Sequence, residues 1–250
     1  MSEAEANLLA AIEQSYSAFA CMSRPQKLLT SPLRDGDEIL QTLTSAPLRE
    51  LTGEQIGPYS SYAITTVGDD RDYRHFLPRI FELAVMDPTW LGAYPAVMAG
   101  KLKMANWRTW PAEQQAAVLR FFRAGFEAAV ERHPNDDHTA KDWFCGIAII
   151  GEPVSPPIEH WRSSSSPNAA LHMASFIIDE AKHLSRHGEV RGGFWEEVSQ
   201  DVRAEVARLL TARRTREFLQ AVASRVADEE QMYFLNPALG VLQQVGCIEA

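Results

Sequence analysis

Two short segments combine histidine with carboxylates at spacings that suit a metal ion. In the first, DEAKHLSRH, Glu180, His183 and His187 recur at one-turn spacing along a predicted helix. A helix offers ligands from one side at such spacing, and di-iron bundles use a Glu-x-x-His pair in this way. Those bundles need a second such pair, and the chain has none. The pattern therefore favours a polar strip at the edge of an apolar helix face over a metal site.

The second segment, ERHPNDDHTAKD, gathers His133, Asp136, Asp137 and His138. Two imidazoles and a carboxylate are a common ligand set for a mononuclear metal. The simpler interpretation is a turn between two helices, in which Asn135 or Asp136 caps the next helix. We prefer the turn, and we predict no metal and no cofactor.

Nucleophilic chemistry has little support in the sequence. The chain lacks the G-x-S-x-G, H-E-x-x-H, Walker and G-x-G-x-x-G motifs. Cys145 lies in an apolar run, which is typical of an inert buried thiol. An enzyme therefore remains only as an alternative hypothesis, a metal-dependent one with a site built from Glu180, His183 and His187 or from His133 and Asp137.

The segment DDRDYRHFLPRIFELA, residues 69–84, predicts an amphipathic helix with Pro78 in its interior. Proline removes one helical hydrogen bond, so we expect a kinked helix or two short helices that share one face. Opposite the apolar stripe lie Arg71, His75 and Arg79, which could recognise an anion or an acidic partner. The plainer interpretation, which we prefer, is a solvated face.

This segment also resembles other proteins. The string TTVGDDRDYRHFLPRIFELA, residues 65–84, is similar to a segment of an uncharacterised bacterial protein family, in which aromatic-basic-His-Phe-Leu-Pro-Arg follows a Thr-Thr-x-Gly turn. The resemblance implies a bacterial, cytoplasmic protein. It implies no activity, cofactor or catalytic residue.

Aromatic residues gather between positions 59 and 110, and ANWRTWP places Trp107 and Trp110 on either side of Arg108. Most buried aromatics belong to a core, but exposed tryptophan and arginine are typical of interface hot spots. The sequence therefore suggests one interaction surface for a partner protein. Its residues are Arg71, His75, Arg79, Trp107, Arg108 and Trp110.

Arginines are frequent in residues 203–225, and such a local excess could bind phosphate. The net charge of the chain is −9, however, which opposes contact with a polyanion. We therefore do not expect a nucleic-acid partner.

Composition and cysteine usage predict a cytoplasmic protein. The three cysteines are far apart and odd in number, which fits reduced thiols rather than a disulfide framework. The N-terminus is acidic, unlike a secretory signal. The longest apolar run, near 143–150, is far shorter than the roughly 20 residues that a membrane span needs. We expect no contact with a membrane.

Helical periodicity dominates the chain, and sustained alternation of apolar and polar residues is absent. Proline after a capping residue predicts helix starts at Asp87, Ser166 and Asn236. Thr52 and Asp35 resemble the first residues of capping boxes. The predicted helices cover about 3–22, 69–84, 111–132, 136–150, 167–187, 194–212, 214–230 and 237–246, with shorter ones in the proline-rich stretch 24–60.

The predicted fold is therefore all-α, an irregular array of roughly nine to eleven helices. Antiparallel helix pairs stacked as in a solenoid are one form that such an array takes. A Pro/Ser-rich loop at 151–167 is the only candidate boundary, but Ile158 and Trp161 suggest that it packs back. We therefore expect residues 1–250 to form a single domain. A helical protein-interaction or regulatory module is the leading functional hypothesis.

Overall fold

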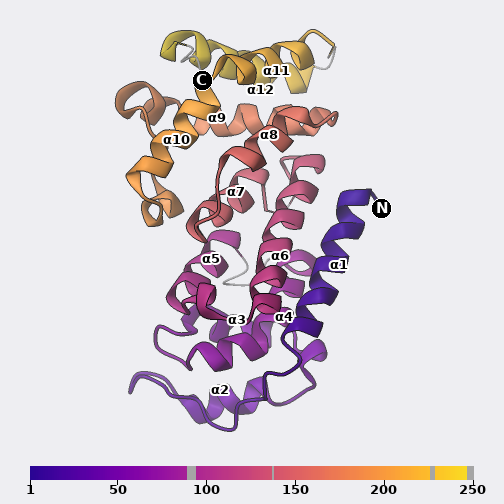
Figure 1. Ribbon diagram of the computed structural model, residues 1–250, viewed down its shortest axis with the longest axis vertical. Coiled ribbons are helices and arrows are strands. Elements are labelled where there is room, and N and C mark those ends of the chain that lie inside the picture. Colours follow the sequence, from indigo (N-terminus) through magenta and orange to yellow (C-terminus); the bar gives the residue numbers. More distant parts are fainter. Residues whose placement is uncertain (89–93, 137, 226–228, 247–250) are drawn as a thin grey trace. The chain divides into compact units, whose positions relative to one another are not determined.

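The described part of the chain folds into helices and loops, as predicted. A computed structural model describes residues 1–250 except 89–93, 137, 226–228 and 247–250. Within that part no strand forms, and only two isolated β-bridges occur. The α-helices (Figure 1) are α1 (Glu3–Ala18), α2 (Gly36–Leu43), α3 (Gly53–Tyr62), α4 (Asp70–Met86), α5 (Pro95–Met104), α6 (Ala112–Glu131), α7 (Ala140–Ile149), α8 (Ser155–Ser163), α9 (Pro167–His187), α10 (Gln200–Thr211), α11 (Arg213–Ala223) and α12 (Glu229–Val245).

Three short 3-10 helices complete the described elements. They are η1 (Leu48–Glu50), η2 (Trp107–Thr109) and η3 (Gly193–Glu197). The described residues form twelve α-helices, more than the nine to eleven that we predicted. One reason is that α8 forms inside the stretch 151–167, which we expected to be a loop. No described helix has the length and apolar character that crossing a membrane requires. A regular stacking of helix pairs stays a prediction.

Local capping signals predicted some helix ends correctly. Thr52 begins a capping box with Gln55, and the Asp35 carboxylate accepts hydrogen bonds from the first turn of α2. Two predicted starts are wrong. Asp87 ends α4 instead of beginning a helix, and Pro237 lies inside α12.

The helix α4 contains Pro78 and is nevertheless one element from Asp70 to Met86. Its predicted apolar stripe is buried throughout: Tyr73, Phe76, Leu77, Ile80 and Ala84 are each at most 1% exposed. A proline inside a helix costs about 3 kcal/mol. Burial of the stripe offsets that cost, which explains why α4 is not divided in two.

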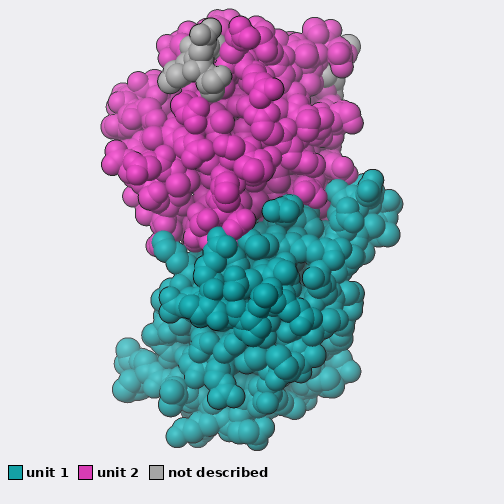
Figure 2. All heavy atoms as spheres, viewed as in Figure 1, with its two compact units in different colours: residues 1–125 teal, residues 126–250 magenta. Residues whose placement is uncertain are grey.

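The contacts divide the chain into two compact units, residues 1–125 and 126–250, and the division falls within α6 (Figure 2). The stretch 151–167 lies inside the second unit. There Ile158 and Trp161 of α8 are completely buried, so this stretch packs back as expected. A single domain for the whole chain stays a prediction.

In the first unit α4 packs against α1 and α3, and aromatic rings fill the space between the helices. Phe81 of α4 stacks on Phe121 of α6, with 3.8 Å between the ring centroids. The ring of Tyr59 in α3 packs edge to face against that of Phe76 in α4, with 4.8 Å between the ring centroids. Offset-stacked and edge-to-face pairs are the favoured aromatic geometries, so this core also fixes the direction of α3.

In the second unit three aromatic rings form a stack. Phe176 of α9 lies between Trp161 and Trp195, with interplanar angles of 17° and 13°. Phe144 of α7 contacts all three rings. The α12 helix packs along α9 on the outside of this unit (Figure 1).

His172 of α9 is a buried titratable group in the second unit. It is 3% exposed, and its Nε2 lies 3.1 Å from the carbonyl oxygen of Arg132. Burial lowers its pKa from the ordinary 6.5 to about 4. The native state therefore holds a neutral imidazole at a pH where the unfolded chain is already protonated.

We predict that this difference makes stability depend on pH. The contribution of the neutral His172 to the free energy of unfolding is fully present above pH 6.5. It is lost as the pH falls toward 4, where the imidazole of the native state is also protonated. The loss amounts to about 3 kcal/mol in the free energy of unfolding. Urea unfolding at a series of pH values measures it. His172→Gln should flatten the slope of the free energy of unfolding against pH between pH 4 and 6.5. The same change at the exposed His160 should leave this slope unaltered.

Candidate functional site

The residues of the predicted interaction surface do not form one exposed surface. Trp107 and Trp110 are only 2% and 4% exposed, so the exposure that we expected of them is absent. Trp110 packs edge to face against Phe19, which directly follows α1, with 5.8 Å between the ring centroids. Arg108 is exposed, with its guanidinium 4.2 Å from the centroid of the Trp107 ring. Both tryptophans are core residues because the short helix η2 turns them inward.

Arg79 is a packing residue rather than part of a solvated face. Its side chain is 14% exposed, and its Nε donates a hydrogen bond to the carbonyl oxygen of Leu51 at 2.8 Å. It also pairs with Glu82, which accepts a hydrogen bond from the Tyr16 hydroxyl. Burial and the Glu82 carboxylate both raise the pKa of Tyr16. This network ties α1, η1 and α4 together.

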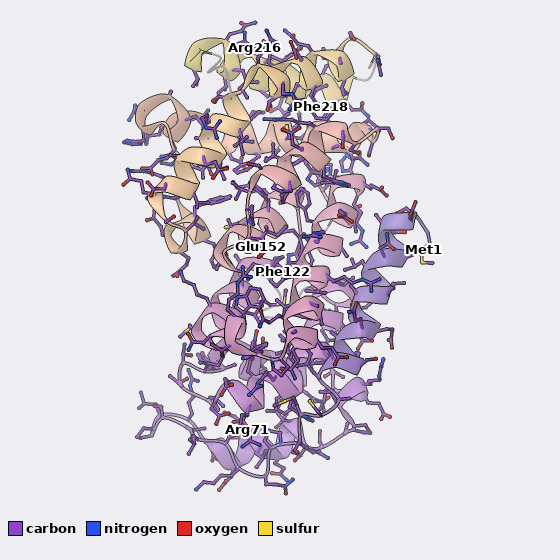
Figure 3. All side chains as sticks on the ribbon, in the orientation of Figure 1. Met1, Arg71, Phe122, Glu152, Arg216 and Phe218 are labelled. Carbon is purple, nitrogen blue, oxygen red and sulfur yellow. The ribbon has the colours of Figure 1, made fainter. Side chains whose placement is uncertain are left out.

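His75 is also committed to packing. Its Nδ1 lies 3.0 Å from the carbonyl oxygen of Met22, and burial lowers its pKa. Arg71 alone of the three predicted cations is exposed (Figure 3). The face opposite the apolar stripe is therefore only partly solvated, because the loop after α1 and the helix η1 cover it.

Two substitutions on α4 separate these roles. Arg79→Ala leaves Glu82 and the Leu51 carbonyl without their cation, and we expect it to lower the free energy of unfolding by roughly 2–4 kcal/mol. Arg71→Ala, about two turns closer to the start of the same helix, should change it by no more than about 0.5 kcal/mol. Chemical denaturation measures both. Equal effects would contradict the assignment of Arg79 to packing.

Of the candidate metal ligands on α9, Glu180 has other partners. Glu180 is buried, and its carboxylate accepts a hydrogen bond from the backbone N–H of Arg191 at 3.0 Å. Lys141 Nζ lies 3.5 Å from its other oxygen. The rings of His183 and His187 are 6.0 Å apart. Within the described residues no three His, Cys, Asp or Glu side chains are placed to hold a metal ion.

The second candidate set lies in a turn. His133 Nδ1 accepts a hydrogen bond from the N–H of Asn135, and the Asp136 carboxylate accepts one from the N–H of His133. Asp137 lies outside the described residues. The cap of α7 is Thr139, in a capping box with Asp142, and not Asn135 or Asp136 as we expected. The Thr139 hydroxyl caps α7 in their place because this helix begins later in the chain than predicted.

Several arginines of residues 203–225 bind within the second unit. Arg203 pairs with the buried Glu189, and Arg191 lowers the pKa of that carboxyl by a hydrogen bond. Arg216 donates to the carbonyl oxygen of Leu242, and Arg214 pairs with Glu159. These contacts occupy guanidinium N–H donors that would be needed to bind the phosphate backbone of a nucleic acid.

The candidate functional site is a hollow of about 330 Å³ between α2 and α3, which we call the α2–α3 hollow. Pockets of this size are typical of ligand sites in proteins. Apolar and polar groups share its wall. Its lining residues are Leu33, Arg34, Asp35, Glu38, Ile39, Thr42, Gln55, Pro58, Tyr59 and Tyr62.

Arg34 and Tyr62 form one wall of the hollow. The Arg34 guanidinium lies over the Tyr62 ring, 3.4 Å from its centroid, which is a cation–π arrangement. In the described part of the chain, the Arg34 side chain has no hydrogen bond and no carboxylate partner. Its guanidinium edge therefore keeps its donors for a bound molecule.

A hydrogen-bonded turn places Tyr62 at the end of α3. The N–H groups of Thr66 and Val67 both donate to the Tyr62 carbonyl oxygen, at 3.0 and 3.2 Å. Ile64 in this turn has a φ of 67°, a left-handed conformation that is unfavourable for a β-branched residue. Such strain persists only where surrounding contacts compensate for it. The turn is therefore a rigid support for Tyr62.

The loop before α2 places Arg34. The N–H of Ser31 donates to the carbonyl oxygen of Thr66, and the N–H of Gly68 donates to that of Leu29. Gly36 then begins α2, where a Cβ would lie 2.9 Å from the Thr30 side chain. Any larger residue at position 36 would require the Thr30 side chain to move.

No pattern in the sequence predicts this hollow. Arg34 and Tyr62 are far apart in sequence, and neither belongs to a known motif. The only available signals were the capping pattern at Asp35 and the Thr-Thr-x-Gly turn, and both predict local structure rather than a binding site.

Comparisons with known protein families, curated proteins and solved structures find no match to this chain. The resemblance of residues 65–84 to a bacterial family therefore stays a prediction.

Proposed function

We propose that the first unit is a recognition module that binds a segment of a partner protein in the α2–α3 hollow. The bound segment carries an aliphatic or aromatic side chain next to a lysine or arginine. The observation that supports this proposal most directly is the Arg34 guanidinium, stacked on Tyr62 at the wall of the hollow.

Exposed apolar side chains near the hollow favour a protein as the partner. Leu33, which lines the hollow, is 91% exposed, and the nearby Leu29 is 67% exposed. Exposed apolar groups that cluster beside a pocket are typical of binding surfaces. Tyrosine and arginine are also the residue types that dominate interface energetics.

The charges near the hollow favour a basic segment. Glu38 lines it, and Asp37 follows Asp35 at the start of α2. The side chains of Asp37 and Glu38 are exposed and have no ion pair with any described residue. Opposite charges across an interface favour the correct partner and accelerate association. A lysine or arginine of the bound segment would pair with these carboxylates.

Arg34 has a different part in this arrangement. Stacking on Tyr62 holds the guanidinium plane in place, while its N–H groups stay available at the edge. A peptide segment presents backbone carbonyl oxygens that accept such donors. Arg34 would therefore orient the main chain of the bound segment, and the hollow would select its side chain.

We also propose that the protein is located in the bacterial cytoplasm. Among the described cysteines, Cys21 is exposed and Cys145 is buried, and neither forms a disulfide. Burial raises the pKa of the Cys145 thiol to about 12, which makes it a poor nucleophile. Free thiols of this kind fit a reducing compartment.

A peptide library displayed against the purified chain tests the proposed function. We expect enrichment of peptides with a basic residue beside an aliphatic or aromatic one. Arg34→Ala and Tyr62→Ala should each weaken the best peptide by about tenfold, since a central interface residue often contributes more than 1 kcal/mol. Fluorescence anisotropy measures the dissociation constants.

The matched control is Arg208→Ala, which removes an exposed arginine from α10 in the other unit. It should leave peptide affinity within about twofold, as expected for a residue outside the interface. Glu38→Lys should reverse the preference from basic to acidic flanking residues. Enrichment of acidic peptides by the unaltered chain, or equal binding by Arg34→Ala, would contradict the proposal.

A further inference from the structure

A second hollow in the first unit is lined mainly by polar and charged residues. It has a volume of about 220 Å³ and lies between the segment 22–27 and the start of α4. Three cations line it: Arg24, Lys27 and Arg71. We call it the cationic hollow. Arg71 is labelled in Figure 3.

The three cations differ from three other arginines of the first unit. Arg49, Arg74 and Arg79 each pair with a carboxylate at 2.9 Å or less. By contrast, the side chains of Arg24, Lys27 and Arg71 are exposed and have no ion pair or hydrogen bond with the described residues. Their donor groups are therefore not used by hydrogen bonds within the described part of the unit.

The two carboxylates of the same hollow, Asp69 and Asp72, are committed to the helix start. Asp69 Oδ1 accepts hydrogen bonds from the N–H groups of Arg71 and Asp72, at 2.9 and 3.1 Å. Asp72 Oδ2 accepts one from the N–H of Asp69 at 3.0 Å. This capping box holds both acids against the backbone. The cations remain free to meet a bound anion.

The segment that carries Arg24 and Lys27 is anchored to α4. His75 lies 3.0 Å from the Met22 carbonyl oxygen, and Pro25 is buried. The backbone of this segment is thus placed without any ligand. Such preorganisation reduces the entropy cost of binding.

We propose that the cationic hollow binds a phosphate group, either free phosphate or the phosphate of a small monoester. Two guanidinium forks and an ammonium suit a phosphate, because arginine donates two parallel hydrogen bonds to its oxygens and lysine adds a point charge. The small volume and the chain's net charge of −9 favour a small anion over a polyanion. This inference does not depend on the α2–α3 hollow.

Isothermal titration calorimetry of the full chain tests the proposal, with inorganic phosphate and glycerol 2-phosphate as probes and sodium chloride held constant. We expect saturable binding of at least one probe. Binding of both would identify a phosphomonoester site, and binding of inorganic phosphate alone would identify a site for the free ion. Binding of neither probe would overturn the proposal.

Variants then locate the site. Arg24→Gln and Arg71→Gln should each weaken binding about tenfold or more, because hydrogen bonds to charged groups are strong. Arg208→Gln removes one exposed positive charge from the other unit and should change affinity less than about twofold. If Arg24→Gln and Arg71→Gln bind phosphate as tightly as Arg208→Gln, the bound ion lies elsewhere and the proposal is wrong. Far-ultraviolet circular dichroism checks that each variant is folded.

Discussion

The loop between α1 and α2 has to satisfy its backbone polar groups without a helix of its own, and both candidate sites depend on how it does so. Buried peptide groups need hydrogen-bond partners. The Met22 carbonyl oxygen lies within hydrogen-bond distance of His75 Nδ1. The Leu29 carbonyl oxygen accepts a hydrogen bond from the N–H of Gly68, and the N–H of Ser31 donates one to the carbonyl oxygen of Thr66. These bonds fasten the loop to α4 and to the turn that precedes it.

The anchored loop explains why two dissimilar hollows occur on the same segment. Its first half presents Arg24 and Lys27 beside the start of α4. Its second half brings Arg34 over the Tyr62 ring beside α2. Loops that a rigid scaffold holds in place are frequent carriers of binding residues. The scaffold here is α4, whose apolar stripe is buried against the rest of the first unit.

Arginine serves opposite purposes in different parts of the chain. Arg79 and Arg162 donate to backbone carbonyl oxygens and pair with carboxylates, so they join helices within their units. Arg34 instead stacks on a tyrosine and keeps its donors. A guanidinium next to backbone carbonyls and carboxylates bonds to them, whereas one that stacks on a ring leaves its N–H groups to water or to a ligand. The positions of neighbouring carbonyls and acids thus decide which arginines remain for recognition.

Local interactions were enough to predict the fold class and several helix ends. The helical period, the capping box at Thr52 and the full extent of α9 follow from residues within a few positions of each other. Such signals failed at Asp87 and Asn236, where a capping residue before proline did not begin a helix because the adjacent helix ends there or continues through it.

Only the tertiary structure decided which polar residues face solvent. The helical period places Arg71 and Arg79 on one face of α4, yet Leu51, directly after η1, contacts Arg79, while Arg71 stays exposed. Trp107 and Trp110 likewise turn inward through η2. The physical reason is that exposure depends on what packs above a side chain, and that neighbour comes from a distant part of the chain. The periodicity of a single helix contains no information about it.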